Sequence, residues 1–241
     1  MNDGIVIIPT YNEIENIESI IRAVLSLPKP FHILIIDDNS PDKTAQKVIE
    51  LQNEFPDRLF LEQREKKSGL GTAYVHGFKW ALDNQYNYIF EMDADFSHNP
   101  NDLERLYDAC HFGRADVAIG SRYITGVNVV NWPLSRVLLS YFASVYVRLI
   151  TGMKIQDATA GFMCYKRQVL ETINLDKIKF IGYAFQIEMK YRAYAKKFEI
   201  IEVPIIFTDR AKGQSKMSGS IIKEAVFGVI SLRFRQFFNR L

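Results

Sequence analysis

Carboxylate side chains gather in residues 91–100, EMDADFSHNP, which follow the apolar run at 88–90. Side chains two positions apart lie on one face of an extended strand, so Glu91, Asp93 and Asp95 are predicted to share a face. Carboxylates this close raise one another's pKa, which indicates a positive partner between them. The oxygen ligands of an Asp-x-Asp pair favour Mg²⁺ or Mn²⁺, and Mg²⁺ completes its shell with water and substrate phosphates. The expected ligand is therefore a diphosphate.

Polar residues also follow the other predicted strands. They are Pro-Thr-Tyr-Asn-Glu at 9–13, Asp-Asp-Asn-Ser at 37–40 and Gly-Ser-Arg-Tyr at 120–123. In an open parallel sheet, ligands bind beyond the carboxyl ends of the strands. We therefore expect one edge of the sheet to collect acids, an aromatic ring and an arginine. The alternative is that these residues only cap the helices that follow, as Asn39, Ser40 and Asp42 are suited to do.

Apolar periodicity predicts the elements that position these residues. Strands are expected at 5–8, 33–36, 59–62, 88–92, 117–119, 162–165 and 200–206, and helices at 13–25, 43–51, 71–82, 100–110, 133–150, 185–196 and 220–241. Alternating strands and helices predict an α/β fold with a mainly parallel central sheet flanked by helices.

The composition is ordinary for a folded soluble domain. The chain has 241 residues, of which 48% are hydrophobic and 24% charged. A net charge of +2 argues against nucleic acid as a partner. Cys110 and Cys164 lie in separate segments, which indicates no disulfide framework and a reducing compartment.

Membrane contact is expected to be peripheral. Pro9 interrupts the first apolar run, so no signal peptide is predicted. The most apolar stretch, 137–147, is shorter than the roughly 20 residues that cross a bilayer. Residues 212–241 carry six Lys or Arg against one Glu, beside an apolar helical pattern, and are predicted to lie in the headgroup plane with the helix at 133–150. The alternative is that both helices are core or dimer surfaces.

Two other folds with polar strand ends fit less well. A response-regulator receiver needs about half this length and leaves the apolar second half unexplained. A dinucleotide site needs a glycine fingerprint after the first strand, where this chain has Pro-Thr-Tyr-Asn-Glu. Gly69 and Gly71 follow the third strand instead and are expected to serve the backbone turn.

Eight motifs in one order carry a resemblance that spans almost the whole chain. They are IIPTYNEIENI, IIDDNSPDKTA, GLGTAYVHGF, MDADFSHNP, GSRY, NWPLSR, DATAGFMCYKR and TDRAKGQSKMS. The chain resembles the dolichol- or polyprenol-phosphate mannose synthases, inverting glycosyltransferases with the Rossmann-like GT-A nucleotide-sugar fold. The first three motifs and Asp-x-Asp are widespread in the superfamily. MDADFSHNP, NWPLSR and the late Asp-Arg…Ser-Lys element are more specific to this branch.

The resemblance implies a role for each matching residue. The guanosine of GDP-mannose would contact Pro9, Tyr11, Glu13, Ile36 and Asp38. The metal and diphosphate would be held by Asp93 and Asp95, with the backbone of Ala94 against the sugar nucleotide. The acceptor phosphate would be gripped by Arg122 and Arg136 beside Ser135, and a loop bearing Arg210 and Lys216 would close on the donor.

The implied reaction is transfer of mannose from GDP-mannose to a polyprenyl phosphate, with inversion, by a single domain at 1–241. Residues 1–125 would bind the nucleotide sugar, and 126–241 would bind the acceptor on the cytoplasmic face of a membrane. A phosphate nucleophile is already anionic and needs cations rather than a strong base, and the arginine fork suits phosphate. A UDP-sugar hexosyltransferase and a non-catalytic sugar-nucleotide-binding protein are the alternatives. A small membrane subunit or a second copy of the chain is a further potential partner.

Each cation also has a plain structural interpretation. Arg122 could form a surface ion pair, Arg136 could be a snorkelling residue at a helix start, and 210–216 could be a solvated turn.

Four polar residues near the motifs are left out of the predicted site. Glu91 is expected to turn into the sheet or accept a neighbour's hydrogen bond, and His98 to be a turn residue rather than a ligand. Gln186 and Glu188 could face the sugar or the acceptor, but positioning the preceding loop is the favoured interpretation.

Overall fold

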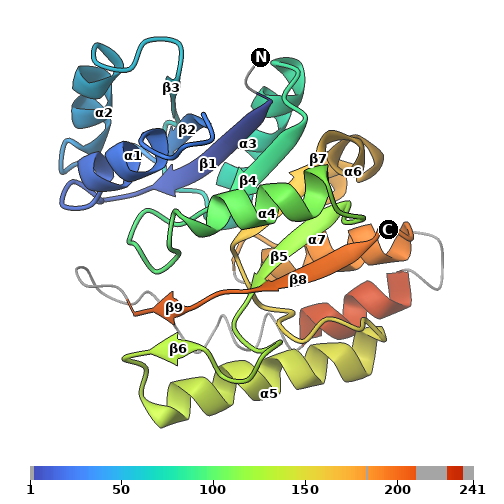
Figure 1. Ribbon diagram of the computed structural model, residues 1–241. Coiled ribbons are helices and arrows are strands. Elements are labelled where there is room, and N and C mark those ends of the chain that lie inside the picture. Colours follow the sequence, from blue (N-terminus) through green and yellow to red (C-terminus); the bar gives the residue numbers. More distant parts are fainter. Residues whose placement is uncertain (1–2, 183, 210–226, 236–241) are drawn as a thin grey trace.

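A seven-stranded sheet in the order β3-β2-β1-β4-β7-β5-β8 forms the centre of the molecule (Figure 1). The structure is a computed structural model and describes residues 3–182, 184–209 and 227–235. The strands of this sheet are β1 (Gly4–Thr10), β2 (His32–Asp37), β3 (Leu59–Gln63), β4 (Tyr88–Glu91), β5 (Val117–Ser121), β7 (Met163–Lys166) and β8 (Ile200–Pro204). Neighbouring strands run parallel except where β7 pairs with β4 and β5, so the mainly parallel α/β sheet is confirmed.

Helices cover both faces of this sheet (Figure 1). They are α1 (Ile17–Leu25), α2 (Thr44–Gln52), α3 (Leu70–Asp83), α4 (Asp102–His111), α5 (Leu134–Thr151), α6 (Arg167–Thr172) and α7 (Ala184–Ala195), with a 3₁₀ turn at Leu175–Lys177 and a helical segment at 227–235. Alternate residues of β1 divide between two apolar clusters. Ile5 and Ile7 pack with α3 and α7, whereas Val6 and Ile8 pack with α1 and α4. The period of two in the strand thus builds both layers of the core.

Some predicted boundaries were wrong for local reasons. The helix expected from residue 13 begins at Ile17, because the Asn16 and Ile17 N–H groups both donate to the Glu13 carbonyl in a turn. The strand expected to reach residue 206 ends at Pro204. The short parallel pair β6 (Val129–Val130) and β9 (Phe207–Thr208) was not predicted, since two-residue strands have no periodicity. Of the helix expected at 220–241, the described part is 227–235.

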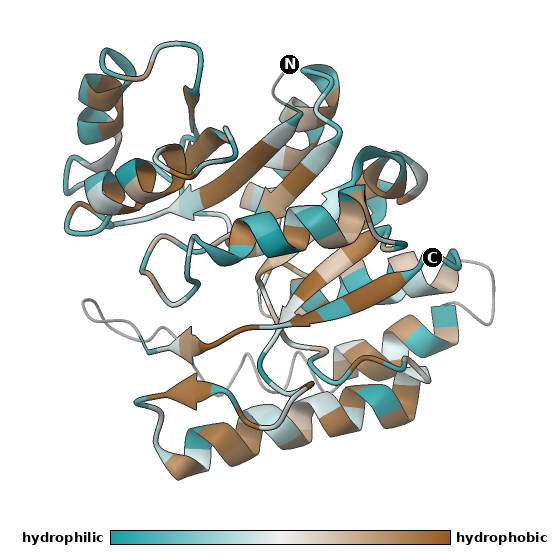
Figure 2. Cartoon of the chain, in the orientation of Figure 1, coloured by the Kyte–Doolittle hydropathy of each residue, from teal (hydrophilic) through white to brown (hydrophobic). Residues whose placement is uncertain are grey.

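The long apolar helix α5 lies on the surface rather than in the core (Figures 1 and 2). Only 17% of its 18 residues are buried, and these are Ser144, Val147 and Thr151. By length and composition alone α5 could cross a membrane, so the argument that the apolar stretch is too short was wrong. The alternative interpretation of α5 as a core helix was also wrong.

Candidate active site

The strand ends β1, β2 and β4 meet at one edge of the sheet, and the turns that follow share a backbone feature. Asn12, Asn39 and Phe96 adopt the left-handed conformation, with φ of 60°, 57° and 60°. Asparagine tolerates this conformation, whereas a bulky Phe is held there only by its surroundings. Backbone strain of this kind concentrates at functional sites, and Phe96 directly follows Asp95.

The ends of β1 and β2 bring together the residues matched to the nucleotide. Pro9 and Ile36 are direct partners across the two strands. Tyr11 follows β1, and the Lys67 ammonium lies 4.2 Å from the centre of its ring. Glu13 lies two residues further on, where its carbonyl accepts hydrogen bonds from the Asn16 and Ile17 N–H groups. An aromatic face, a cation and carboxylates thus flank the end of β1.

Asp38, in the turn after β2, is held by an arginine that the sequence interpretation missed. Arg64 Nε donates to Asp38 Oδ1 over 2.6 Å, and the same guanidinium donates to Thr72 Oγ1 over 2.8 Å. Asp38 is 7% exposed, so this ion pair is largely shielded from water. Arg64 directly follows β3, and its position at a strand end was the available signal.

Asp93 and Asp95 lie in the turn after β4, where neighbouring backbone groups fix them. The Ser97 N–H donates to Asp95 Oδ1 over 3.1 Å, and the Asp93 N–H donates to His98 Nδ1 over 3.2 Å. His98 is 3% exposed and stacks on Phe162, with ring centres 4.8 Å apart. Burial lowers the pKa of His98 to about 4, so the ring is neutral and supports the turn, as expected of a turn residue.

The oxygen ligands of this turn fit a hard divalent cation whose remaining ligands come from a bound substrate. No group of three or more His, Cys, Asp or Glu side chains arranged for a metal occurs among the described residues. Two carboxylates leave most coordination positions of Mg²⁺ or Mn²⁺ to water and phosphate oxygens. Asp93 and Asp95 therefore suit an ion that arrives with a diphosphate.

Glu91 does not share a task with the two aspartates, although the alternation of side chains predicted a common face. The strand β4 ends at Glu91, so Asp93 and Asp95 belong to a turn. Glu91 is fully buried and accepts hydrogen bonds from the Tyr165 hydroxyl, over 2.9 Å, and from Gln186 Nε2. Burial raises the pKa of Glu91 to about 7. The expectation that Glu91 turns inward is confirmed.

Arg122, after β5, is a buried residue whose partner also went unnoticed in the sequence. Its Nε and Nη2 donate to the two carboxylate oxygens of Asp157 over 2.7 and 2.6 Å, and Nη2 also reaches Thr159 Oγ1. Arg122 is 7% exposed and Asp157 is fully buried, so the ion pair is not a surface pair. Burial opposes the charge of both groups, yet their attraction raises the pKa of Arg122 and lowers that of Asp157. Asp157 begins the motif DATAG, but nothing in that motif indicates Arg122 as its partner.

Arg136, in the first turn of α5, lies against the same aromatic ring as Arg122. The two guanidinium carbons are 4.1 and 5.5 Å from the centre of the Trp132 ring, respectively. Arg136 also donates to Asp209 Oδ1 over 2.9 Å. Ser135 precedes it and is exposed. The structure thus brings two predicted phosphate-binding cations to one tryptophan, whereas Arg210 and Lys216 lie outside the described residues.

The model of the family described as Glycosyl transferase family 2 matches residues 5–173. The chain belongs to glycosyltransferase family 2. The polyprenol monophosphomannose synthase of Mycolicibacterium smegmatis is 49% identical over 225 residues, which are 93% of this chain and 84% of that protein. The undecaprenyl-phosphate mannosyltransferase of Micrococcus luteus is 42% identical over 92% of this chain and 90% of its own. The dolichol-phosphate mannosyltransferase of Pyrococcus furiosus is 36% identical over 91% and 60%, respectively.

Solved structures of other glycosyltransferases share the fold. Glucosyl-3-phosphoglycerate synthase from Mycobacterium tuberculosis, in complex with Mn²⁺, UDP and glucosyl-3-phosphoglycerate, superposes with a TM-score of 0.69 at 16% identity. The match covers 98% of this chain and 80% of that one. This likeness confirms the GT-A fold of the family 2 enzyme.

Two polar residues of α7 in this glycosyltransferase have structural partners. Glu188 Oε2 accepts hydrogen bonds from the Lys179 and Phe180 N–H groups, over 2.9 and 3.0 Å. The interpretation that Glu188 positions the preceding loop is therefore confirmed. Gln186 instead contacts Glu91 at the end of β4.

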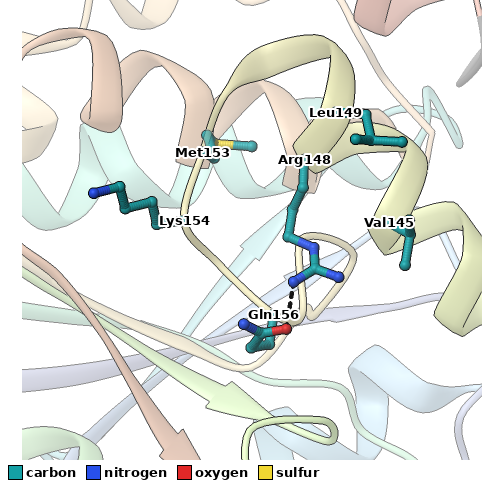
Figure 3. Close-up of a pocket in the computed structure, with 6 residues that line it drawn as sticks. All are labelled: Val145, Arg148, Leu149, Met153, Lys154 and Gln156. Carbon is teal, nitrogen blue, oxygen red and sulfur yellow. Dashed lines mark hydrogen bonds between the residues drawn. The ribbon is translucent and has the colours of Figure 1, made fainter.

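A cavity of about 390 Å³ lies at the carboxyl end of α5, away from these residues (Figure 3). It is lined by Val145, Arg148, Leu149, Met153, Lys154 and Gln156, and Arg148 points toward Gln156, to which it donates a hydrogen bond. None of the predicted site residues of the glycosyltransferase lines it. The cavity is therefore not part of the predicted active site. It adds apolar and cationic surface at the carboxyl end of α5.

Proposed function

We propose that this family 2 glycosyltransferase transfers mannose from GDP-mannose to a polyprenyl monophosphate with inversion, giving polyprenyl phosphate β-mannose and GDP. The proposal rests on the match, over more than nine-tenths of the chain, to three relatives. They are named as a polyprenol monophosphomannose synthase, an undecaprenyl-phosphate mannosyltransferase and a dolichol-phosphate mannosyltransferase. The family itself makes transfer of a sugar the reaction class.

On the donor side, the guanosine would lie over the ends of β1 and β2, against Pro9, Tyr11, Glu13, Ile36 and Asp38. Asp93 and Asp95 would hold Mg²⁺ or Mn²⁺, which supplies positive charge beside the leaving diphosphate. Because Ser97 and His98 already fix this turn, little reorganisation is needed when charge develops on the leaving group. The backbone of Ala94 would face the sugar nucleotide, and Arg210 and Lys216 would close over the diphosphate.

On the acceptor side, Arg122 and Arg136 would hold the lipid phosphate beside Ser135. The raised pKa of Arg122 keeps its guanidinium charged in a buried position. The lipid phosphate is itself the nucleophile, and two cations offset its repulsion from the donor diphosphate. Attack from the face opposite the leaving group inverts the anomeric carbon, so an α-linked donor gives a β-linked product.

One incubation tests the function. Purified protein with Mn²⁺ or Mg²⁺ and a short polyprenyl phosphate is given radiolabelled GDP-mannose, UDP-glucose or UDP-N-acetylglucosamine in parallel. Transfer of label to lipid from GDP-mannose is expected, and the β-anomer is checked by NMR of the product. Transfer from a UDP-sugar alone would exclude the mannose assignment, and transfer from none would exclude the enzyme activity.

Arg136→Ala is expected to raise the KM for the lipid phosphate about tenfold or more while the Kd for the donor stays within threefold, because a charged hydrogen bond contributes about 1.5–3 kcal/mol. Steady-state kinetics with varied acceptor, and donor binding by calorimetry, measure the two quantities. Arg167→Ala is the matched control, since it also removes an arginine from an ion pair, with Glu171 over 2.6 Å. An equal loss of donor affinity in Arg136→Ala would contradict its assignment to the acceptor.

We further propose that α5 lies in the headgroup plane on the cytoplasmic face of a membrane. Exposed large apolar side chains recur along it, namely Leu134, Leu138, Leu139, Tyr141, Phe142 and Leu149. Arg148 and Lys154 beside this stripe suit anionic headgroups (Figure 3). A small membrane subunit or a second copy of the chain is the alternative occupant of the surface.

Phe142→Asp is expected to weaken binding to vesicles of phosphatidylcholine and phosphatidylglycerol about tenfold or more, since burying a Phe side chain contributes about 1.5–3 kcal/mol. Co-sedimentation of the full chain measures the effect. Phe112→Asp makes the same change at the end of α4, where Phe112 is 78% exposed against 60% for Phe142, and should leave binding unchanged. Equal binding of the two variants would contradict the orientation.

A further inference from the structure

The helix α7 carries four buried polar side chains beneath the proposed active site. Gln186, Glu188, Lys190 and Arg192 are between 0 and 4% exposed. Buried polar and charged groups are costly unless they are paired and hydrogen-bonded. They form two pairs four residues apart, and such pairs lie on one side of a helix. The pair Glu188 and Arg192 holds the loop before α7. The pair Gln186 and Lys190 instead contacts the end of β4 and the loop that contains Ala160.

Gln186 and Lys190 connect two segments that are far apart in the sequence. Gln186 Nε2 donates to Glu91 Oε2 over 2.5 Å, at the last residue of β4. Lys190 Nζ donates to the Ala160 carbonyl over 2.5 Å and to the Gln186 carbonyl over 3.1 Å. Burial lowers the pKa of Lys190 to about 8, and the opposite charge of Glu91 opposes this shift.

Each of these two segments leads directly to one half of the proposed site. Glu91 ends β4 two residues before Asp93, and Asp93 lies in the turn matched to the donor diphosphate. Ala160 belongs to the loop whose Asp157 receives the backbone N–H, Nε and Nη2 of Arg122, over 3.0, 2.7 and 2.6 Å. Glu202 fixes the same loop from β8, by accepting the N–H groups of Gln156 and Asp157. Hydrogen bonds, together with short stretches of backbone at 91–93 and 157–160, therefore link the donor turn to the acceptor arginine.

We propose that Gln186 and Lys190 are positioning residues that set the separation between the Asp93–Asp95 turn and Arg122, and hence between the two bound substrates. The inference rests on the proposed function, because it takes the donor to lie at the aspartates and the lipid phosphate at Arg122. The attacking oxygen must lie about 3–3.5 Å from the anomeric carbon, and a misplacement of about 1 Å costs about 10²-fold in rate. Gln186 and Lys190 are 3% and 0% exposed, so each acts through the groups that it holds.

Lys190→Met tests the inference, and Arg192→Met is its matched control. Both variants replace a buried cation of α7 by a side chain of similar length, but Arg192 bonds to Glu188 and the Lys177 carbonyl rather than to the site. We expect Lys190→Met to lower kcat about 10–100-fold, with the donor Kd and the acceptor KM within threefold of wild type. Arg192→Met is expected to unfold at lower urea concentration and to keep kcat within threefold, measured well below its melting temperature.

Gln186→Leu is the second variant, which exchanges a neutral amide for an apolar side chain of similar size and keeps the test decisive if Lys190→Met does not fold. It should show the same fall in kcat with unchanged substrate affinities. The inference is overturned if the folded variant has the kcat of Arg192→Met, or if a weaker donor Kd or a higher acceptor KM accounts for its whole loss. Wild-type turnover of GDP-mannose decides the proposed function separately, because the inference compares variants with an active parent.

Discussion

Asp95→Ala is expected to lower kcat about 10³-fold or more while the protein keeps its fold. Asp95 is 8% exposed, and its Oδ1 accepts the Ser97 N–H in the turn after β4. Under the proposed function this carboxylate holds the divalent ion beside the leaving diphosphate, where negative charge develops in the transition state. Removing one group that stabilises such charge typically costs about 10²–10³-fold in kcat, and loss of the ion adds to this.

Two comparisons make the Asp95 result specific. Asp102→Ala removes an aspartate that is also 8% exposed, but Asp102 pairs with Arg105 at the start of α4, and its loss should leave kcat within threefold. Treatment with a chelator should abolish wild-type activity, and added Mn²⁺ or Mg²⁺ should restore it in wild type but not in Asp95→Ala at the same concentration. Retained turnover in Asp95→Ala would remove the metal from the mechanism.

The sheet and the edge that carries the site could be predicted from the sequence because both depend on local patterns. Alternating apolar strands and amphipathic helices determine a mainly parallel sheet, and the carboxyl ends of parallel strands meet at one edge. The turns after β1, β2 and β4 therefore meet, as expected from PTYNE, DDNS and DAD. The antiparallel β7 could not be predicted in this way, since a four-residue apolar run does not indicate its direction.

The partners of the site residues could not be predicted, because they depend on distance in space. Arg64 and Asp38 are 26 positions apart, and Arg122 and Asp157 are 35 apart. Nothing in the spacing of these residues shows whether an arginine is paired with a carboxylate of its own chain or is available to bind a substrate. The same is true of Lys190, which amphipathic patterning would place at the surface and which the structure buries completely between β4 and the loop at 157–161.

The sequence alone left α5 with two interpretations, an interfacial helix and a core helix, for a different reason. A helix that is apolar on nearly all sides satisfies both the pattern of a core helix and that of an interfacial helix. Burial distinguishes the two, and the buried residues of α5 are Ser144, Val147 and Thr151. Side chains of small or moderate size at those positions let α5 lie close to the domain, while the large side chains of the stripe face outward.

Asp157→Ala is expected to lower the free energy of unfolding by about 3–5 kcal/mol, because it leaves the Arg122 charge buried without its partner. Both residues are at least 93% shielded, at 7% and 0% exposure, so water cannot replace the lost carboxylate. The variant also releases the Arg122 guanidinium and the Arg122 N–H, which both donate to Asp157. Urea denaturation followed by circular dichroism measures the change in stability, and the acceptor KM should rise because Arg122 loses its orientation.

Asp176→Ala provides the contrast between a buried and an exposed ion pair. Asp176 pairs with Lys79 over 2.5 Å, yet its side chain is 79% exposed, so its loss should cost less than about 1 kcal/mol. The double variant Arg122→Met/Asp157→Leu should recover much of the stability lost in Asp157→Ala, since replacing both partners removes the unpaired charge. It should not recover activity, because the cation proposed to hold the lipid phosphate is gone. If Asp157→Ala proved as stable as Asp176→Ala, Arg122 would have to be solvated in the folded protein. The buried ion pair with Asp157 would then not be the interaction that orients Arg122.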